Sequence, residues 1–575
     1  MTNIPKINQN NIVKILFAQK KKIIFLCLSM IAIIILEFAS ISFFLPFLDI
    51  LFSQADSTKI QNKLSREIYN FLLGYNFKET VIILSLFLMI VYIVKNLLII
   101  FLNYLNLNLL YNLQQYFHKK ALDFFYNKKY EDIQSLKTSD VLRDILGEPK
   151  NIIGYLSSWT NIIIESSIVL LLLLLLLSSQ PKSILVFVVI VLIGISTFIL
   201  TYKKLNKWGN SRFKSSSDVL KFIILPFSNN AEIKILKLES YFKNSFNIAN
   251  IKFQRAGMNV NFVLGLNKNI FEMFFIILIL LSLIFVAKYN DSILANSMSS
   301  LSFLFVIALR VIPSINKIIT AFQALNFTSK SISHFLSTVG SYESNLNFKN
   351  LSSLPKFISI FLDNVSFKYK DKDKLTLHNI SLKIDKGGKL AISGDSGSGK
   401  STLVKLISGL LEPTSGKIFY NENETSIFGC KWEKSLVYVS QKSFIFNGTL
   451  LENITLDFDK KTYDINKINK IIEICDLEDV FRNLDNKIYE EVKDGGSNFS
   501  SGQIQRIAIA RSLYCSPDIL ILDEATNALD KKSQDHIIKG ILNIPDLTVI
   551  CVSHDEQILN YFKKVYKFSN GKINN

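Results

Sequence analysis

The chain has 575 residues, which is more than one hydrophobic core usually organises, so at least two domains are expected. Hydrophobic residues make up 49% of it, a share that is high for a soluble enzyme, and the apolar excess lies before residue 330. The formal net charge of +18 fits lysines and arginines on the cytoplasmic side of a membrane better than a nucleic-acid partner, and the five cysteines lack the spacing of a zinc site or a disulfide framework.

The N-terminus has the pattern of a first membrane helix that is not cleaved. Lys20, Lys21 and Lys22 precede a long apolar stretch, and no small-residue cleavage site follows at the distance typical of a signal peptide. A helix that crosses a bilayer needs about 20 mostly apolar residues. By this criterion we expect six membrane spans, at residues 23–48, 81–105, 152–178, 183–202, 263–287 and 294–320.

The connections between these predicted spans differ in length and charge. Residues 106–151 and 203–262 are long, polar and rich in Lys and Arg, so the positive-inside rule places them and the N-terminus in the cytoplasm. With six spans, the C-terminal part of the chain is cytoplasmic too. We expect both connections to be helical and to contact the cytoplasmic domain through turns near 130–137 and 239–246; ordinary loops are the alternative.

The first external connection is longer than a simple turn. Apolar residues recur in it at helical spacing, with charged residues between them. Two interpretations are open: a short amphipathic helix on the outer membrane surface, or a packed lid with no role toward substrate. The apolar positions that define the helix are Ile60, Leu64, Ile68, Phe71 and Leu72.

A linker is predicted at 336–356, which is rich in Ser and Asn and lacks an apolar period. It separates a membrane domain at 1–335 from a domain at 357–575. In the second domain an apolar strand, 390–393, runs into a Gly-rich loop that opens a helix. Glycines let backbone N–H groups surround phosphates, and the helix N-terminus adds its positive end. The predicted phosphate-binding loop consists of Gly394, Asp395, Ser396, Gly397, Ser398, Gly399, Lys400 and Ser401.

The same domain carries the acidic groups that nucleotide hydrolysis needs. Lys400 is expected to reach the β- and γ-phosphates of ATP, and Ser401 to ligate Mg²⁺. A second apolar strand, 519–522, delivers Asp523 and Glu524 at its end. Asp523 is the expected Mg²⁺ partner and Glu524 the expected general base for the attacking water. A surface acidic pair is the weaker alternative, because four apolar residues lead straight into it.

The order of these motifs resembles that of an ATP-binding-cassette (ABC) ATPase over residues 357–575. The whole chain resembles an ABC exporter half-transporter, which implies a helical six-span membrane domain followed by an α/β P-loop ATPase domain. Ser500, Ser501, Gly502 and Gln503 match the signature loop of the family. The family usually has Gly at the position of Ser501, but a backbone N–H survives the change, so activity is expected.

The resemblance also implies roles for single residues. Gln441 matches the family's Q-loop, Asp530 its D-loop and His554 its switch histidine, while Tyr369 matches the aromatic ring that stacks on adenine. In this family the signature loop of one subunit closes on the ATP of the other, so a dimer is implied. A homodimer is expected because the catalytic positions are intact. The implied catalytic residues are Glu524, His554 and Gln441; the metal contacts are Ser401, Gln441 and Asp523; the nucleotide contacts extend to Thr402.

Charged residues inside the predicted spans are the best indication of cargo, because intramembrane charges are costly. Lys95 lies in the second span, Lys268 in the fifth, and Arg310 and Lys317 share one face of the sixth. A cavity lined with these cations predicts an anionic cargo, such as a phosphate or pyrophosphate head group. Mutual pairing, for example of Lys268 with Glu272, is the alternative. The other acids in the spans are Glu37 and Glu165.

A narrower resemblance agrees with an anionic cargo. Residues 35–47 and 309–320 are similar to the first and sixth spans of bacterial lipid-linked oligosaccharide flippases of the PglK type. In that family, basic residues at the positions matching Lys95, Lys268, Arg310 and Lys317 face the pyrophosphate of the lipid carrier. Three of the four are Lys here where the family tends to Arg, which keeps the charge but loses bidentate geometry.

The two resemblances together imply an ATP-driven flippase in the bacterial inner membrane with both termini in the cytoplasm. Its implied partners are a second copy, membrane lipids and an anionic lipid-linked substrate, with no nucleic acid. An exporter of peptides, drugs or other lipids on the same fold is the nearest alternative. A soluble ABC ATPase acting on DNA or ribosomes is opposed by the six spans, and a membrane regulator without transport is opposed by Glu524 and His554.

Overall fold

The computed structural model describes residues 20–52, 63–72, 75–179, 184–289, 291–340, 356–421, 432, 435–457, 463–482, 484 and 487–574. The chain divides into two units, each treated by itself below. The membrane unit comprises Met1–Lys128 and Ser135–Glu343, and the ATPase unit comprises Lys129–Gln134 and Ser344–Asn575.

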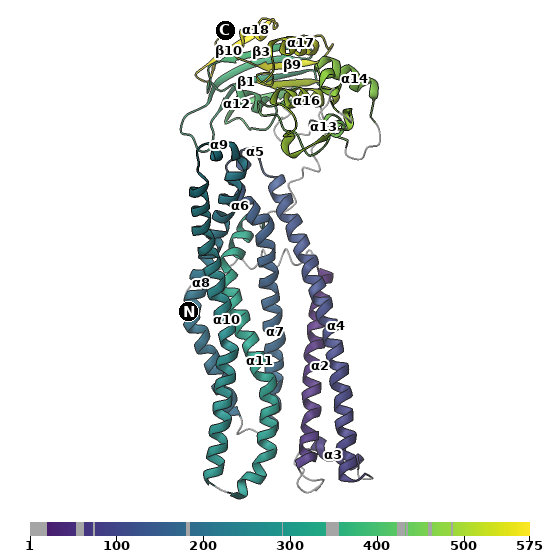
Figure 1. Cartoon of the computed structure of the whole chain (residues 1–575), viewed down its shortest axis with the longest axis vertical. Helices are drawn as coiled ribbons and strands as arrows, with labels where there is room; N and C mark the ends of the chain where they lie inside the picture. Colours follow the sequence, from purple (N-terminus) through teal and green to yellow (C-terminus); the bar gives the residue numbers. More distant parts are fainter. Residues whose placement is uncertain are drawn as a thin grey trace. The chain divides into compact units, whose positions relative to one another are not determined.

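Long helices dominate the described part of the membrane unit (Figure 1). Two of them, with 50 and 51 residues, would be about 75 Å long, more than twice the hydrocarbon thickness of a bilayer. They therefore extend beyond the membrane, into the segments where the sequence predicts helical connections. The long helices are α2 (Lys20–Phe52), α4 (Phe77–Tyr126), α7 (Glu148–Ser179), α8 (Ile184–Ser228), α10 (Glu239–Tyr289) and α11 (Asp291–Phe335).

Four helical segments among the described residues are long and apolar enough to cross a membrane: Lys21–Leu51, Phe77–Tyr126, Thr138–Leu177 and Glu239–Ile277. Helices α8 and α11 cover the other two predicted spans, but the side chains of some residues in each helix are not described. The count of six spans therefore stays a prediction.

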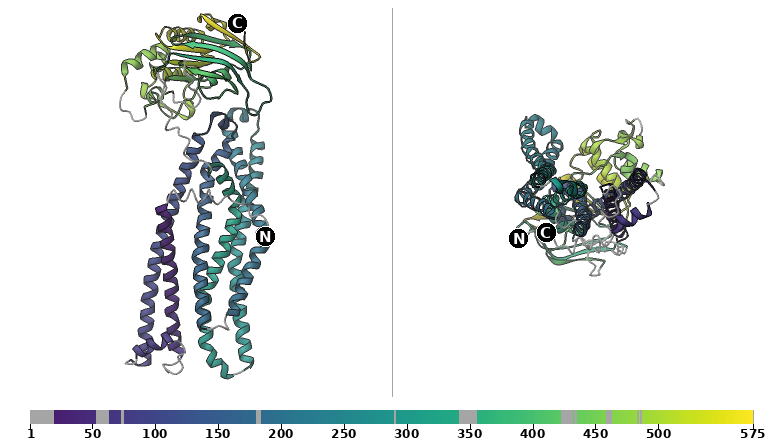
Figure 2. Two further views of the ribbon diagram at one scale, coloured as in Figure 1. Left: turned by 180° about the vertical axis from the view of Figure 1, so that it is seen from behind. Right: turned by 90° about the horizontal axis from the view of Figure 1, so that it is seen from below.

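Within the membrane unit, α2 pairs with α4, and α7, α8, α10 and α11 form a second group (Figures 1 and 2). Aliphatic side chains of α7, such as Leu172, fill the space between these helices together with Phe271 of α10 and Val311 of α11. Helices α8 and α11 approach closely at Gly209, where an added Cβ would lie 2.2 Å from the carbonyl oxygen of Phe327. A glycine is required there because the obstacle is backbone, which cannot rotate away.

The short helix expected in the first external connection is present as α3 (Lys63–Phe71), although residues 60–62 lie outside the described set. It packs on α2, and the buried Ser65 donates a hydrogen bond to Asp49 Oδ2 at 2.7 Å. Phe71, the last residue of α3, is 88% exposed. Short helices in the cytoplasmic connections are α5 (Tyr130–Gln134), α6 (Thr138–Leu142), the π-helix η1 (Arg143–Gly147) and α9 (Asn230–Ile235).

The predicted linker, 336–356, begins too early. Its first five residues form a π-helix, η3 (Leu336–Gly340), directly after α11. Leu336 and Val339 are buried in a cluster with Phe117 of α4 and Phe335 of α11. A polar composition hid this because only two of the five residues are large and apolar. Residues 341–355 lie outside the described set.

The ATPase unit is built on a sheet of six strands in the order β11-β10-β3-β9-β8-β5. All its neighbours pair in parallel except β10 and β11, and the central strands β8 and β9 are buried throughout. The strands are β3 (Lys389–Gly394), β5 (Leu436–Val439), β8 (Ile519–Asp523), β9 (Thr548–Val552), β10 (Lys564–Ser569) and β11 (Lys572–Asn574).

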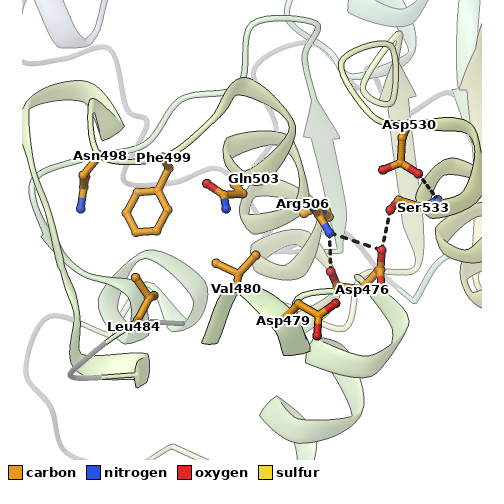
Figure 3. A pocket seen from close by; sticks show the side chains of 10 residues that line it. All are labelled: Asp476, Asp479, Val480, Leu484, Asn498, Phe499, Gln503, Arg506, Asp530 and Ser533. Atoms are coloured by element: carbon orange, nitrogen blue, oxygen red, sulfur yellow. Dashed lines mark hydrogen bonds and ion pairs between the residues drawn. The ribbon is translucent and has the colours of Figure 1, made fainter. Parts of the chain in front are cut away.

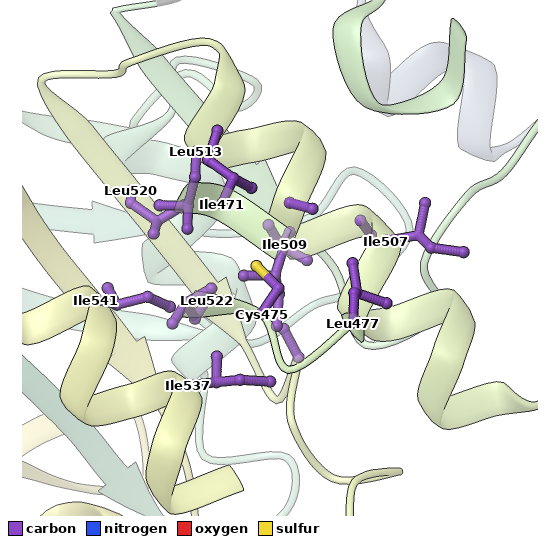
Figure 4. Packing of buried hydrophobic residues seen from close by; sticks show 14 of the residues in the cluster. Ile471, Cys475, Leu477, Ile507, Ile509, Leu513, Leu520, Leu522, Ile537 and Ile541 are labelled. Atoms are coloured by element: carbon purple, nitrogen blue, oxygen red, sulfur yellow. The ribbon is translucent and has the colours of Figure 1, made fainter. Parts of the chain in front are cut away.

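Alternate side chains of β8 serve two separate cores, as the period of a strand requires. Ile519 and Ile521 face a cluster shared with the antiparallel sheet β2-β1-β4 and with α12. Leu520 and Leu522 face the opposite cluster, built with α14, α16 and α17 around the buried Cys475 (Figure 4). Cores on both faces fix the strand, and its last residue, Asp523, is thereby fixed at the carboxyl edge.

The remaining elements of the ATPase unit are as follows. The second sheet contains β1 (Ser359–Phe367), β2 (Leu377–Asp385) and β4 (Ser415–Tyr420), and a small ribbon pairs β6 (Gly448–Thr449) with β7 (Glu491–Val492). The helices are α12 (Lys400–Ile407), α13 (Leu450–Thr455), α14 (Ile465–Ile474), α15 (Glu478–Arg482), η5 (Lys487–Tyr489), η6 (Asp494–Gly496), α16 (Ser501–Tyr514), α17 (Lys531–Leu542) and α18 (Glu556–Leu559).

Candidate active site

The Gly-rich loop connects β3 to α12 and has a backbone that only glycine allows at two points. Gly394 and Gly399 have φ angles of +141° and +107°. A Cβ on Gly394 would lie 2.1 Å from the carbonyl oxygen of Phe568, and one on Gly399 would lie 2.7 Å from the side chain of Leu377. The neighbouring strands therefore press the loop into a tight curve at the start of α12.

One polar side chain of this loop is held by the loop's own carbonyl oxygens, and another has no hydrogen-bond partner among the described residues. Lys400 is 7% exposed, and its Nζ donates to the carbonyl oxygens of Gly394 at 2.7 Å and Asp395 at 2.8 Å. The hydroxyl of Ser398 is buried and has no hydrogen-bond partner in the described part of the chain. Phosphate oxygens would supply acceptors to both side chains, next to the positive end of α12. The loop therefore fits a nucleotide phosphate.

Asp523 and Ser401 meet at the edge of the sheet. Ser401 Oγ lies 3.4 Å from Asp523 Oδ1, although 122 residues separate them. The second carboxylate oxygen, Oδ2, accepts a hydrogen bond of 2.8 Å from the hydroxyl of Tyr438 on β5. A hydroxyl and a carboxylate in this arrangement are oxygen ligands of the kind that Mg²⁺ takes beside phosphates, so the residues present fit the metal.

Glu524 is held in a strained backbone conformation beside Asp523. Its φ of +53° is uncommon for a residue with a side chain, and such strain tends to occur at functional sites. Its Oε2 accepts from Gln441 Nε2 at 2.9 Å and from Asn527 Nδ2 at 3.2 Å. His554 Nδ1 lies 3.8 Å from the other oxygen, Oε1. The structure thus gathers the three residues to which the sequence assigns catalysis.

The aromatic residue expected at adenine lies beside the same helix. The hydroxyl of Tyr369 is 3.1 Å from Thr402 Oγ1, at the start of α12. Its ring contacts Phe367 edge to face, with 4.9 Å between the centroids. The ring is therefore fixed next to the phosphate-binding loop and half-buried.

The signature loop forms the start of α16. Ser500 and Gln503 cap the helix reciprocally: Gln503 N donates to Ser500 Oγ at 3.2 Å, and Ser500 N to Gln503 Oε1 at 2.8 Å. Gly502 approaches the D-loop so closely that a Cβ would lie 2.9 Å from the carbonyl oxygen of Ala528. Among the described residues, no hydrogen bond joins 500–503 to 394–402.

A polar pocket of about 350 Å³ lies beside this helix (Figure 3). Arg506 Nη1 donates to Asp476, whose Oδ2 also accepts from Ser533 Oγ at 2.5 Å. Asp530 caps α17 by accepting from Ser533 N at 3.0 Å, and this bond lowers the pKa of the Asp530 carboxyl. The pocket borders the signature helix and the D-loop, and none of its lining residues belongs to the phosphate-binding loop.

Three residues around the site escaped the sequence analysis: Tyr438, Asn527 and Gln505. Gln505 is buried in α16, where its Oε1 accepts from Ala528 N at 2.9 Å and its Nε2 donates to the carbonyl oxygen of Gln441 at 3.4 Å. It thus joins the D-loop to the Q-loop. The sequence did contain a signal for two of them, because Gln505 is a polar residue among apolar side chains of a helix and Tyr438 carries a hydroxyl in an apolar strand. Buried polar groups of this kind usually have hydrogen-bond partners.

Helix α5, which precedes α6 in the chain, belongs to the ATPase unit. The sequence predicts that the turn near 130–137 contacts the ATPase domain, and α5 makes such contacts through charged and aromatic side chains. Lys370 Nζ lies 2.7 Å from Asp132 Oδ1, and Lys370 N donates to Glu131 Oε1 at 3.1 Å. Tyr130 packs against the apolar cluster beneath β5 and β8.

Five charged side chains in the predicted spans form a network within the described part of the membrane unit. Glu37 Oε2 lies 3.3 Å from both Lys95 Nζ and Arg310 Nε. Glu165 Oε2 lies 3.3 Å from Arg310 Nη2, and Glu165 Oε1 lies 2.6 Å from Lys317 Nζ. The network therefore links α2, α4, α7 and α11.

This network contains mutual pairing of the kind that the sequence left open as the alternative, while a role of the cations toward substrate stays a prediction. Three of the four expected substrate contacts, Lys95, Arg310 and Lys317, are paired with carboxylates, because an apolar environment makes unpaired charge costly. The pairing considered from sequence, Lys268 with Glu272, is not seen between these two described residues, and both are exposed. Arg310 Nε is buried and still lacks a hydrogen bond, since its contact with Glu37 has unsuitable geometry.

Comparison with family models finds two matches. Residues 377–527 match the model described as "ABC transporter", and residues 23–312 match "ABC transporter transmembrane region". The second match covers about half of the chain, and the first contains the phosphate-binding loop, the signature loop and Glu524.

Curated relatives match part of the chain. A lacticin-481/lactococcin-DR transport/processing ATP-binding protein of Lactococcus lactis subsp. lactis is 35% identical over 37% of this chain and 30% of its own length. The alpha-hemolysin translocation ATP-binding protein HlyB of Escherichia coli O157:H7 is 34% identical over 36% of this chain and 30% of its own length. The chain thus spans about a third of the length of these relatives.

A solved structure matches nearly the whole chain. A bacterial Atm1-family ABC exporter with ATP bound superposes with a TM-score of 0.77, covering 96% of this chain and 94% of that one. The two sequences are 18% identical, so the likeness concerns the fold: a helical membrane domain followed by an ATPase domain.

Proposed function

The chain belongs to the ABC transporter family, and on that premise we propose that it is an ATP-driven exporter whose working form is a homodimer in the bacterial inner membrane. The observation that carries the proposal is the convergence of Lys400, Ser401 and Asp523 with Glu524 at the carboxyl edge of one sheet. We propose that both termini lie in the cytoplasm, where ATP is.

The roles of the residues follow from their positions. Lys400 leaves the loop carbonyls and binds phosphate oxygens, while Ser401, Asp523 and Gln441 would hold Mg²⁺. The metal, when bound, neutralises charge on the β- and γ-phosphates. Glu524 accepts the proton of the attacking water. Gln441 and His554, whose side chains already lie beside the Glu524 carboxylate, orient that water.

The test is a pair of substitutions in purified protein. We expect Glu524→Gln to bind ATP and to lose nearly all turnover, because an amide cannot accept the proton. Lys400→Ala should instead weaken ATP binding itself. Glu556→Gln, an exposed carboxylate of the same unit, is the matched control and should hydrolyse ATP normally. Wild-type turnover in Glu524→Gln would refute the assigned general base.

Two observations support a dimer. The signature loop makes no hydrogen bond to the phosphate-binding loop within the described residues, which is compatible with a signature loop supplied by a second chain. Large apolar side chains also stand exposed around α9, where a partner would cover them. They are Phe227 (80% exposed), Ile235 (79%), Leu236 (64%) and Tyr241 (61%).

Mixing subunits tests the dimer. When wild-type chains are co-assembled with increasing fractions of Glu524→Gln chains, a dimer with coupled sites should lose turnover faster than the wild-type fraction falls. A strictly linear fall would show that each chain works alone.

For the cargo we propose an anionic lipid-linked head group, such as the pyrophosphate of a lipid-linked oligosaccharide. Three cations share two carboxylates in the network, so it has an excess charge of +1 in each chain and twice that in a dimer. Arg310 keeps an unused donor, and Lys317 is 54% exposed. Glu37 and Glu165 then act as internal counter-ions that an incoming anion displaces.

A peptide or protein cargo is the second candidate. It is favoured by the names of the relatives, which transport lacticin-481/lactococcin-DR or translocate alpha-hemolysin, although those matches cover about a third of this chain. The paired state of Lys95, Arg310 and Lys317 is compatible with it too, because cations that already have carboxylate partners need no anionic cargo.

The two cargoes are separated by measuring flipping of a fluorescent lipid-linked oligosaccharide and ATP hydrolysis in the same vesicles. Arg310→Ala and Lys317→Ala should abolish flipping while basal hydrolysis persists, because hydrolysis occurs in another unit. Lys330→Ala, an exposed cation of the same helix, is the control and should flip normally. Normal flipping by both network variants would remove the anionic-head-group proposal.

A further inference from the structure

Tyr438 contacts the expected metal site from a strand that the ATP motifs do not include. Its hydroxyl donates to Asp523 Oδ2 at 2.8 Å, while Asp523 Oδ1 faces Ser401 Oγ at 3.4 Å. The two oxygens of one carboxylate are thus divided between a tyrosine of β5 and a serine of α12. A carboxylate held at one oxygen cannot turn freely about its side-chain bonds.

The register of the sheet explains why this tyrosine reaches Asp523. Strand β5 pairs in parallel with β8, with Tyr438 opposite Ile521. Ile521 and Asp523 are two residues apart and point to the same face of the sheet. The ring of Tyr438 packs on that face against the cluster that also contains Tyr130. Its orientation is therefore set by the core and not by the nucleotide.

The hydroxyl of Tyr438 donates to a carboxylate that is itself an expected metal ligand, and the ring is held by packing in the core. A donor fixed in this way is the arrangement by which outer residues orient the ligands of a metal.

We propose that Tyr438 is a positioning residue for Mg²⁺. Its hydroxyl holds Asp523 Oδ2, so that the other carboxylate oxygen, Oδ1, is directed toward Ser401 and the expected metal. The proposal rests on the proposed function, since it assumes that Asp523 and Ser401 serve the metal that accompanies ATP. It assigns to Tyr438 a role that acts through Asp523.

The test uses Tyr438→Phe, which keeps the ring and removes the hydroxyl. Mn²⁺ binding is titrated by electron paramagnetic resonance in the presence of a non-hydrolysable ATP analogue, and analogue binding is measured separately with EDTA. We expect Mn²⁺ affinity to fall about 10-fold, the lower end of what loss of an outer-shell contact costs, with analogue affinity in EDTA unchanged. The matched control is Tyr566→Phe, a half-buried tyrosine of the same sheet and cluster that makes no side-chain hydrogen bond within the described residues.

Wild-type or tighter Mn²⁺ binding by Tyr438→Phe would overturn the proposal, because the hydroxyl would then be neutral toward the metal or compete with it. If Tyr438→Phe also loses thermal stability, the double variant Tyr438→Phe with Asp523→Asn distinguishes a positioning role from a general loss of stability. A positioning role predicts that Tyr438→Phe adds no further loss of Mn²⁺ affinity on that background, and an additive loss contradicts it. Failure of the proposed function is distinguishable, because the wild-type protein itself would then show no Mn²⁺ site that depends on the ATP analogue.

Discussion

Removing the charge of Glu165 should weaken the membrane unit by an amount that can be estimated from its contacts. Glu165 accepts from Ser314 Oγ at 2.7 Å, a bond that Gln can keep, and is paired with Arg310 and Lys317. Lys317 is 54% exposed and can turn to solvent, so its pair contributes about 0–1 kcal/mol. Arg310 is 19% exposed, and leaving a buried charge with less compensation costs about 3–5 kcal/mol. We expect Glu165→Gln to cost about 3 kcal/mol, since Glu37 still compensates Arg310 in part.

The assay is unfolding in detergent by titration with a denaturing surfactant, followed by tryptophan fluorescence. Trp159 lies on α7, six residues before Glu165, and reports on the same helix. The measurement is made for Glu165→Gln, for Arg310→Gln and for the double variant. Because the two side chains are in contact, the double variant should be more stable than the sum of the single losses predicts, by about 2 kcal/mol.

The control is Glu272→Gln, which makes the same chemical change at an exposed glutamate of α10 outside the network. It should shift the free energy of unfolding by less than about 0.5 kcal/mol. A loss below about 1 kcal/mol for Glu165→Gln, together with additivity in the double variant, would refute the stabilising role of the network.

Further predictions concern packing, a buried thiol and topology. Gly209→Ala should destabilise the membrane unit by about 1–3 kcal/mol because the added methyl meets backbone, whereas Gly257→Ala, with open space around it, should be neutral or stabilising when thermal unfolding is measured. Burial raises the pKa of the Cys551 thiol to about 12, so its contribution to stability is present below the ordinary pKa of 9.0 and is lost as the pH rises toward 12. Mass spectrometry should accordingly find Cys551 unmodified by iodoacetamide at neutral pH until the ATPase unit unfolds. In a background without the natural cysteines, Asn70→Cys should react with an impermeant maleimide from outside the cell and Ser240→Cys from inside only; the opposite pattern would overturn the predicted topology.

The ATP site was the part of the molecule most open to prediction from sequence. The apolar strands that end at Gly394 and Asp523 are short and local patterns, so they place the loop and the acidic pair without knowledge of the fold. Tyr438 and Gln505 could not be assigned in this way. Their contacts depend on the register of β5 against β8 and on the position of α16, which local patterns do not contain.

The membrane unit shows where sequence reasoning fails. Glu37 and Arg310 are 273 residues apart, and their contact depends on which faces of α2 and α11 meet. The sequence predicted the charges in the spans and left their mutual pairing open, with Lys268 and Glu272 as the example, but it could not identify which charges meet. Lys95, Arg310 and Lys317 pair across helices instead, because an unpaired charge in the low-dielectric interior of the membrane is costly. The boundary at 336 was missed for a similar reason, since Val339 is buried in a cluster with residues of α4 that are distant in the sequence.

The most direct measurement of the central claim is ATP-dependent transfer by purified protein in sealed vesicles. Wild-type protein and Glu524→Gln are reconstituted side by side, and transfer of a fluorescent lipid-linked oligosaccharide is followed with and without ATP. We expect transfer by the wild type only when ATP is present, and none by Glu524→Gln although it binds ATP. Transfer at equal rates by the two proteins, or transfer by the wild type without ATP, would contradict a transporter driven by hydrolysis at this site.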